Sequence, residues 1–365
     1  MPMTDAERLA AHRACTRFLA GHGPRNARRE LTALAAEAAE DDRGDWYGEG
    51  ETLAAFERDV ATLLDKPAAV FMPSGTMAQQ IALRIWSDRR GGAPVAFHPT
   101  SHLELHEQRG YAFLHALRAL LVGDRQRLIR RSDLDALAEP IAALLLELPQ
   151  REIGGQLPTW DELVQEAEWA RAHGVALHLD GARLWETQPW FARPLAEIAA
   201  PFDSVYVSFY KILGGVAGAA LAGPADFIAE ARVWQRRHGG NLVTLYPFVL
   251  SARAGLRDRL GRIEAYVARA GAVARCLTAI PGVRVVPDPP QVNMMHVVLP
   301  GDPEVLLDES ARIAQDERVS LFTWLRASEV PGFSTFELTV GDGAMALDDA
   351  LLARLFRRVV GAGAA

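Results

Sequence analysis

The stretch DSVYVSFYKILGG, residues Asp203–Gly215, decides how this sequence is interpreted. Its β-favouring residues predict a buried strand that runs into a single lysine, Lys211, and a pair of glycines follows. In open α/β sheets, side chains just beyond the carboxyl end of a strand reach the crevice where ligands bind. An exposed loop lysine is the alternative interpretation, so the rest of the chain has to decide between the two.

Apolar runs and helical patterns alternate from about residue 50 to residue 225. Short apolar runs separated by helices are typical of a mainly parallel sheet that is covered on both faces. The strand-like runs are AAVFMPSGT, PVAFHP, IAALLLELP, VALHLDGA and DSVYVSFY. The helical runs are TLAAFERDVATLL, MAQQIALRIWSD and DELVQEAEWARAHG, and a further helix begins at HLELHEQRG. We therefore expect an α/β fold.

The order of predicted elements changes after residue 225, where long helical patterns precede short strands and a final helix. That order predicts a smaller α+β domain. We expect an N-terminal helical segment over residues 1–44, a large domain over residues 45–250 and a small C-terminal domain over residues 251–365.

Composition and charge exclude several classes of protein. Apolar residues make up 49% and charged residues 23% of the 365 residues, as in ordinary globular proteins. The net charge of −7 argues against a nucleic-acid partner. No apolar run approaches the ~18 residues of a membrane span. Two distant cysteines, Cys15 and Cys276, have no metal-ligand spacing and fit a reducing compartment. We expect a cytoplasmic protein that holds no metal.

The N-terminal stretch MPMTDAERLAAHRACTRFLA reads as an amphipathic helix with Thr4 as its N-cap. It is charged throughout and lacks the apolar centre of a signal peptide.

Two further stretches contain groups that could do chemistry. HLDGAR places Asp180 at the end of a strongly apolar strand, where an unpaired buried carboxylate would be costly. A salt bridge to Arg183 is the structural explanation, and a cationic ring nitrogen is the functional one. MPSGTMAQQIAL places Ser74, Gly75 and Thr76 at the start of a helix, where backbone amides can bind an anion.

These three features have one common explanation. The chain has neither the GxxxxGK[ST] pattern of a P-loop nor a GxGxxG stretch after the first strand, so nucleotide cofactors are disfavoured. A phosphate-binding turn, an aspartate on one strand and a lysine after the next strand are what pyridoxal phosphate requires. Lys211 would form the Schiff base, and Asp180 would keep the pyridine nitrogen protonated so that the ring accepts electrons.

At this point the chain resembles the threonine aldolase and β-eliminating lyase family of fold type I pyridoxal-phosphate enzymes, over roughly residues 45–300. The resemblance rests on seven motifs that occur in the family's order. They are DWYGEGETLAAFE, FMPSGTMAQQIAL, SHLELHEQRG, LELPQREIGGQLP, HLDGARLWE, SVYVSFYKILGG and VNMMHVV. It implies an aspartate-aminotransferase-like, three-layer large domain with a seven-stranded sheet, and a homodimer or homotetramer with active sites at subunit interfaces.

The resemblance also implies roles for individual residues. Lys211 matches the Schiff-base lysine and Asp180 the partner of the pyridinium. His102 matches a histidine that stacks on the cofactor ring and assists proton transfer, and Glu107 follows it at the family's spacing. Arg183 matches an arginine that binds the substrate carboxylate.

Three other matches are implied in the same way. Ser74, Gly75 and Thr76 form the phosphate turn. Ser208, three residues before the lysine, could add a cofactor contact, although a serine at a strand end needs no such role. Tyr47, in DWYG, would lie near the cofactor of a neighbouring subunit and contact substrate.

The sequence departs from the family on the substrate side. The nearest match to the family's second carboxylate-binding arginine, in FSTFELTVGDG, is Glu337. A histidine that the family places near the substrate hydroxyl is replaced by the segment around Gln150 and Arg151, and the family's N-terminal serine segment has no counterpart. Arg326 or Arg151 could supply the missing cation. Alternatively, Glu337 recognises a cationic end of the substrate.

The predicted reaction is cleavage of a β-hydroxy-α-amino acid into glycine and an aldehyde. Two alternatives stay open. One is a β-eliminating lyase, or another pyridoxal-phosphate enzyme, that acts on a different and possibly cationic amino acid. The other is a protein that binds the cofactor without turnover.

Overall fold

The computed structural model describes residues 2–41 and 43–363, and their contacts divide them into two units. The larger unit comprises Ala27–Glu152 and Gln156–Gly261. The smaller unit combines the residues up to Asn26, Ile153–Gly155 and the residues from Arg262 onward. This division differs from the expected boundaries, which lay after residues 44 and 250.

The larger unit is built around a seven-stranded sheet with the order β2-β8-β7-β6-β5-β3-β4. Strands β7, β6, β5, β3 and β4 are parallel to one another, whereas β8 is antiparallel to both β2 and β7. In sheet order the strands are β2 (Ala68–Met72), β8 (Ala219–Gly223), β7 (Ser204–Ser208), β6 (Ala176–Gly181), β5 (Ala143–Glu147), β3 (Val95–Phe97) and β4 (Ala119–Leu121). The expected α/β fold with a mainly parallel seven-stranded sheet is confirmed.

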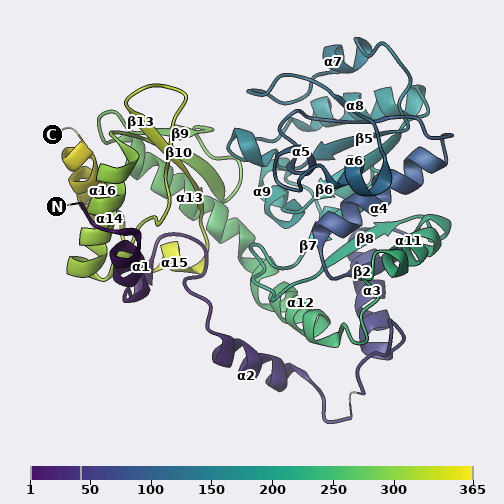
Figure 1. The fold of residues 1–365 in the computed structure, drawn as a ribbon, viewed down its shortest axis with the longest axis horizontal. Coiled ribbons are helices and arrows are strands. Elements are labelled where there is room, and N and C mark those ends of the chain that lie inside the picture. Colours follow the sequence, from purple (N-terminus) through teal and green to yellow (C-terminus); the bar gives the residue numbers. More distant parts are fainter. Residues whose placement is uncertain (1, 42, 364–365) are drawn as a thin grey trace. The chain divides into compact units, whose positions relative to one another are not determined.

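Helices cover both faces of this sheet, which gives three layers (Figure 1). Strand β2 illustrates the reason, because successive side chains point to opposite faces. Val70 and Met72 pack in one cluster with helices α4 and α11, while Phe71 packs edge-on against Phe56 of helix α3, with ring centroids 5.9 Å apart. The helices of this unit are α2 (Ala27–Glu37), α3 (Glu51–Leu63), α4 (Gly75–Asp88), α5 (His102–Leu105), α6 (Gly110–His115), α7 (Arg131–Asp135), α8 (Trp160–Ala172), α9 (Gln188–Phe191), α10 (Leu195–Ala199), α11 (Ala225–Arg237) and α12 (Tyr246–Arg259).

Two local features of this unit were not predicted from the sequence. Strand β8 has the sequence AALAG, which lacks β-branched residues, yet all five residues are buried between β2 and β7. Its small side chains let helices approach closely, so tertiary packing overrides a weak strand propensity. The helix expected to begin at HLELHEQRG ends after four residues, and His106 follows as its C-cap.

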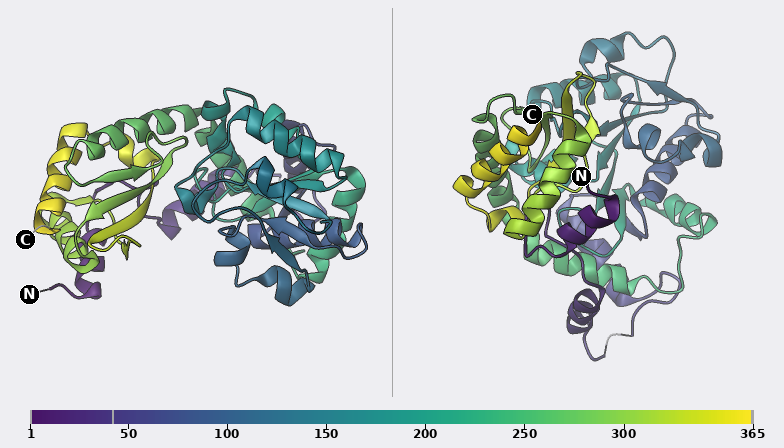
Figure 2. Two further views of the ribbon diagram at one scale, coloured as in Figure 1. Left: turned by 90° about the horizontal axis from the view of Figure 1, so that it is seen from above. Right: turned by 60° about the vertical axis from the view of Figure 1, so that its left-hand side comes forward.

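The smaller unit contains a four-stranded antiparallel sheet with the order β12-β13-β10-β9. Its strands are β9 (Arg284–Val286), β10 (Met294–Pro300), β12 (Arg326–Ala327) and β13 (Phe333–Thr339). Its helices are α1 (Asp5–Arg13), α13 (Ile263–Thr278), α14 (Pro303–Glu317), α15 (Asp342–Met345) and α16 (Asp349–Gly363). Helices α13 and α16 lie along one face of the sheet (Figure 2). The expected α+β character is confirmed.

The long helical pattern after residue 250 is interrupted. A 3₁₀ turn at Leu260–Arg262 separates α12 from α13, and the boundary between the two units falls within this turn.

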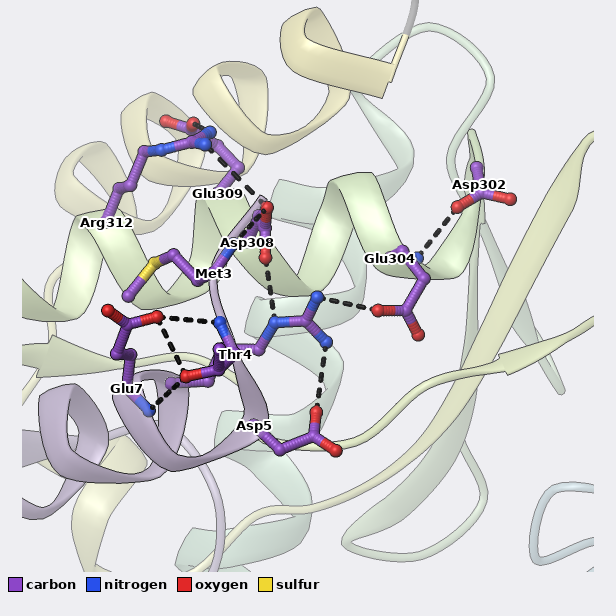
Figure 3. Close-up of polar contacts among 10 residues, drawn as sticks. Met3, Thr4, Asp5, Glu7, Asp302, Glu304, Asp308, Glu309 and Arg312 are labelled. Carbon is purple, nitrogen blue, oxygen red and sulfur yellow. Dashed lines mark hydrogen bonds and ion pairs between the residues drawn. The ribbon is translucent and has the colours of Figure 1, made fainter. Parts of the chain in front are cut away.

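The helix in the N-terminal segment is shorter than the sequence pattern predicts. Helix α1 begins with the predicted Thr4 cap, which forms a capping box with Glu7 (Figure 3). It ends at Arg13, because residues Arg17–Phe18 form strand β1, parallel to β11 (Val319–Ser320). Long-range pairing thus replaces the last turns of the expected helix.

One buried and one exposed ion pair of Arg8 attach α1 to α14. The Nε atom of Arg8 donates to Oδ1 of Asp308 at 2.8 Å, and the backbone amide of Met3 donates to the other oxygen of Asp308 at 3.0 Å (Figure 3). A second guanidinium nitrogen of Arg8 lies 2.6 Å from Glu304. Arg8 and Asp308 are both nearly inaccessible to solvent. These contacts explain why the first 26 residues belong to the smaller unit.

Replacing Arg8 with methionine should therefore loosen α1. Removing one member of a buried ion pair leaves the other charge uncompensated, which costs about 2–3 kcal/mol where some hydrogen bonds remain. Native-state amide exchange in α1 should accelerate roughly 30- to 150-fold. Arg312, which lies 3.7 Å from the same carboxylate but is more exposed, provides the control. Arg312→Met should change exchange severalfold at most, and equal effects of the two variants would contradict the prediction.

Among the residues that the structure describes, no helix combines the length and the apolar character required for a bilayer span.

Candidate active site

The carboxyl ends of three neighbouring parallel strands bring the predicted groups together. Strand β5 ends at Glu147, and this residue lies opposite Asp180 of β6 in the strand register. Asp180 in turn lies opposite Tyr206 of β7, and Lys211 follows three residues after the end of β7. Because parallel strands place these ends at one edge of the sheet, the groups converge although they are far apart in sequence.

A pocket lies at this edge, entirely within the larger unit. It is lined by Thr76, His102, Glu107, Glu147, Asp180, Ala182, Tyr206, Tyr210 and Lys211. Five of the predicted site residues are among them, namely Thr76, His102, Glu107, Asp180 and Lys211.

Asp180 is the buried carboxylate of the pocket, with 2% of its surface exposed. Its Oδ1 atom accepts a hydrogen bond of 3.1 Å from the backbone amide of Ala182. Burial raises the pKa of Asp180, and the positive charge of Lys211 opposes that rise. Within the described residues, Asp180 has no ion pair with an arginine or lysine. The carboxylate is thus placed to receive a cation.

The amine of Lys211 has a lowered pKa, which suits a nucleophile. Burial and the charge of Arg183 lower its pKa to about 8, while Asp180, Glu147 and Glu186 oppose the change. A lysine with this pKa carries a substantial free-amine fraction near neutral pH. The chain contains only one other lysine, Lys66, whose amine donates to the carbonyl of Phe202 at 2.6 Å.

Helix α4 presents its N-terminus to the pocket. Ser74 is the N-cap, and its hydroxyl accepts from the backbone amide of Met77 at 3.3 Å. Thr76, in the first turn, lines the pocket. A Cβ atom at Gly75 would lie 1.9 Å from the hydroxyl of Tyr206, so only glycine fits beneath this tyrosine. The N-terminus of a 14-residue helix with free amides is a suitable phosphate site.

His102 has a fixed orientation. Its Nδ1 atom lies 3.0 Å from Oε1 of Glu107, and Oε2 of Glu107 accepts a longer bond of 3.4 Å from Gln80 of α4. The buried carboxylate favours the tautomer in which Nδ1 carries the proton, so Nε2 is left for another partner. The closest hydrogen-bond partner of Glu107 is His102, and a contact between Glu107 and substrate, which the family's spacing implies, stays a prediction.

Arg183 follows β6 directly, at the N-cap of a 3₁₀ turn, Leu184–Thr187. It is close enough for its charge to lower the pKa of Lys211. Ser208 ends β7, and its hydroxyl donates to the carbonyl of Ala182 at 2.7 Å. Because that hydroxyl is already engaged and Ser208 is not among the pocket residues, its contact with a cofactor stays a prediction.

The remaining predicted residues are not part of this pocket. Tyr47 is 45% exposed, with φ of 50°, and its backbone amide donates to Val243 at 2.9 Å. Arg326 lies on β12, and Glu337 lies on β13 opposite His296 of β10, so both belong to the smaller unit. The roles of these three residues stay predictions.

Three polar residues of the pocket, Glu147, Tyr206 and Tyr210, were missed by sequence reasoning. The hydroxyls of Tyr206 and Tyr210 lie 3.3 Å apart. Burial and the charge of Asp180 raise the pKa of Glu147 to about 7, although the backbone amide of Arg151, 3.2 Å from Oε1, opposes the rise. Glu147 ends a buried strand in the same manner as Asp180, and this parallel is the signal that could have found it.

These residues fit the cofactor that the sequence implies. A protonated ring nitrogen would supply the positive charge that buried Asp180 lacks. Thr76, in the first turn of α4, lines the pocket, so a phosphate bound there would meet the N-terminus of this helix. Lys211 is the amine of the pocket. The residues present therefore match all three functional parts of pyridoxal phosphate.

Comparisons with known proteins agree with this geometry. The chain is similar to a candidate L-allo-threonine aldolase from Listeria monocytogenes EGD-E, with 41% identity and a TM-score of 0.93 over 98% of this chain and 99% of that one. A candidate aromatic amino acid β-eliminating lyase or threonine aldolase from Exiguobacterium sp. 255-15 has 42% identity and a TM-score of 0.92 over the same shares. The low specificity L-threonine aldolase of Escherichia coli (strain K12) is 31% identical over 66% of this chain and 72% of its own length.

The family model of the β-eliminating lyases matches residues 26–300, which include every residue of the pocket. The chain therefore belongs to the β-eliminating lyase family and is a pyridoxal-phosphate-dependent lyase.

Proposed function

We propose that the protein cleaves a β-hydroxy-α-amino acid into glycine and an aldehyde, in the manner of the threonine aldolases that it resembles. The observation that carries this proposal is the single pocket in which Lys211, Asp180 and His102 meet. The similarity to threonine aldolases selects aldol cleavage among the reactions that such a pocket can support.

Four groups of the pocket hold the cofactor in this proposal. When bound, pyridoxal phosphate offers an aldehyde carbon to an amine and a cationic ring that takes up the electron pair of a broken bond. Lys211 attaches it, and Asp180 pairs with the ring nitrogen. The N-terminus of α4, with the hydroxyl of Thr76, binds the phosphate. His102 packs on the ring, and its orientation is held by Glu107.

The substrate is held on the open side of the pocket. Arg183 would bind the substrate carboxylate and so orient the Cα–Cβ bond for cleavage. A base then removes the proton of the β-hydroxyl, and His102 is the predicted base, either directly or through a water molecule. Lys211 would also be the group that moves the proton at Cα.

Neighbouring subunits are expected to complete the site. We propose a homodimer or homotetramer in which Tyr47 of one subunit lies near the pocket of another. The exposure of Tyr47, together with that of Trp46 beside it at 66%, supports this proposal.

The experiment that tests the function uses the cofactor-loaded protein with L-threonine, L-allo-threonine and phenylserine. Glycine and aldehyde should form in equal amounts. Ammonia and a keto acid from serine or cysteine, without aldehyde from any hydroxy amino acid, would instead indicate β-elimination. A stable cofactor spectrum without any product would indicate a binding protein. The substrate panel should include cationic amino acids, because Glu337 replaces an arginine of the family.

Glu337 allows a direct test of substrate choice. If this carboxylate repels the substrate carboxylate, Glu337→Arg should increase kcat/KM for simple β-hydroxy amino acids by roughly tenfold, as one added charge-assisted contact would. Glu337→Gln separates loss of repulsion from gain of attraction and should give a smaller increase. Unchanged or reduced activity of Glu337→Arg would rule out the charge-reversal hypothesis.

A further inference from the structure

A second imidazole–carboxylate pair lies beside His102. His106, four residues further along, has its Nε2 atom 2.7 Å from Oε1 of Glu152. In the first pair Glu107 holds Nδ1 of His102, whereas in the second pair Glu152 holds Nε2 of His106. The two histidines are therefore oriented through opposite ring nitrogens, and Nδ1 of His106 has no hydrogen-bond partner among the described residues.

The two rings are neighbours at the open side of the pocket. Their centroids are 5.1 Å apart and their planes are tilted by 39°. His102 lines the pocket, and His106 lies next to it without lining the pocket. Their side chains are 34% and 39% exposed, so His106 is open to molecules that enter alongside His102.

Glu152 is suited to orient a base. Its side chain is only 14% exposed, and Arg151 lies 3.0 Å from the same carboxylate oxygen. The guanidinium is also 3.2 Å from Nε2 of His106, but Oε1 of Glu152 is closer, at 2.7 Å, so we assign Nε2 as the donor to Glu152. A largely buried carboxylate that accepts from one imidazole nitrogen fixes the tautomer and leaves the lone pair of the other nitrogen available. In His106 that free nitrogen is Nδ1.

We propose that His106, oriented by Glu152, is the base that accepts the proton of the substrate's β-hydroxyl, while His102 stays on the face of the cofactor ring. This inference rests on the proposed aldol cleavage and reassigns one of its roles. The resemblance assigns His102 to the face of the ring, whereas the His106 ring lies 5.1 Å from it and its Nδ1 atom is not engaged by Glu152.

The proton and electron balance of the step is simple. The O–H bond breaks, and its proton moves to Nδ1 of His106. The electron pair of that bond forms the C=O bond of the aldehyde. The Cα–Cβ bond breaks, and its pair stays with the Cα fragment, for which the cofactor would supply the electron-accepting ring. A later proton at Cα gives glycine, so His106 is needed only for reactions that involve a β-hydroxyl.

Because His106 should be needed only when the substrate has a β-hydroxyl, the experiment compares one reaction that involves this group with one that does not. His106→Gln keeps an amide near the position of Nε2, and hence a contact with Glu152, but has no base at Nδ1. Cleavage of L-allo-threonine or phenylserine is measured as kcat. Exchange of the α-hydrogen of glycine in D₂O is followed by NMR, since this reaction uses the same cofactor without a β-hydroxyl. Cofactor affinity is measured by equilibrium dialysis, independently of turnover.

We expect kcat for cleavage to fall about 100-fold, the lower end of the range for a lost general base. Glycine exchange and cofactor affinity should stay within about twofold. Glu152→Gln, which weakens only the orientation of the ring, should lower cleavage by roughly tenfold with the same selectivity. His173→Gln, at an exposed histidine after α8, is the control for a histidine-to-glutamine change and should alter none of these readouts.

Two results would overturn the assignment. A parallel loss of cleavage and glycine exchange in His106→Gln would make His106 a structural or cofactor-supporting residue. Unchanged cleavage would leave the base with His102. Failure of the proposed function is distinguishable from both, because in that case the unmodified protein would exchange glycine or bind the cofactor but release no aldehyde.

Discussion

Lys211→Ala is expected to abolish covalent attachment of the cofactor and to lower kcat/KM by at least about 10³-fold, because the variant lacks the amine that holds the cofactor and moves the proton at Cα. Borohydride reduction of the loaded protein, followed by peptide mass spectrometry, should place the cofactor mass on Lys211 alone. The mapping is unambiguous because Lys66 is the only other lysine of the chain.

Lys66→Met is the matched control. Burial also lowers the pKa of Lys66, so a depressed pKa by itself does not distinguish the two amines. Their positions distinguish the two amines, since Lys211 lines the pocket and Lys66 does not. Lys66→Met should keep the covalent attachment. Cofactor mass on Lys66, or an unchanged absorption spectrum of the cofactor in Lys211→Ala, would contradict the assignment of Lys211 as the attachment site.

The rate at which the cofactor attaches should depend on pH through the protonation of Lys211. Only the unprotonated amine attacks the aldehyde, and the pKa of Lys211 in the cofactor-free protein is about 8. The rate of reconstitution should therefore rise roughly tenfold per pH unit below that pKa and level off above it. The rate of colour development after adding the cofactor measures this profile.

Asp180→Asn should lower kcat by roughly 100- to 1,000-fold while the cofactor still binds. The asparagine side chain is nearly the same size but cannot keep the ring nitrogen protonated, so the ring loses most of its capacity to accept electrons. Losing one preorganised electrostatic contact in a buried site costs about 3–4 kcal/mol of transition-state stabilisation. Steady-state kinetics, together with the absorption of the bound cofactor, would measure both effects.

Glu147 offers the control for Asp180, because it is a second buried carboxylate in the same pocket and lies opposite Asp180 in the register. With its pKa raised to about 7, it is partly protonated at neutral pH, so Glu147→Gln replaces a group that is already partly neutral. Its effect on kcat should be much smaller. Equal losses in the two variants would mean that the paired carboxylates act together and that Asp180 has no separate role.

The strands that build the pocket could be predicted because each is a short apolar run. The runs VALHLDGA and DSVYVSFY are interpretable on their own and lead directly to Asp180 and Lys211. Strand β8 could not be predicted, since alanine and glycine have little strand preference and only its two neighbours make it a strand. Likewise, α1 stops early because Arg17 pairs with Val319, about 300 residues away.

The same contrast applies to the site. Thr76, Asp180 and Lys211, which line the pocket, could be predicted because their chemistry is evident from local sequence: a helix start, a strand-end carboxylate and a strand-end amine. Glu147 and Tyr206 were missed, because their place in the pocket follows from strand register. The pair of His106 with Glu152 was also missed, since the two residues lie 46 positions apart.

By itself, the sequence determined the alternation of strands and helices and the identity of the reactive groups, because both depend on residue type and on neighbours within a few positions. Only the tertiary structure decided which groups face one another. Register sets Glu147 beside Asp180, and close packing makes Gly75 obligatory beneath Tyr206. Burial then lowers the pKa of Lys211 and raises that of Glu147, since the cost of removing a charge from water depends on the whole surrounding fold.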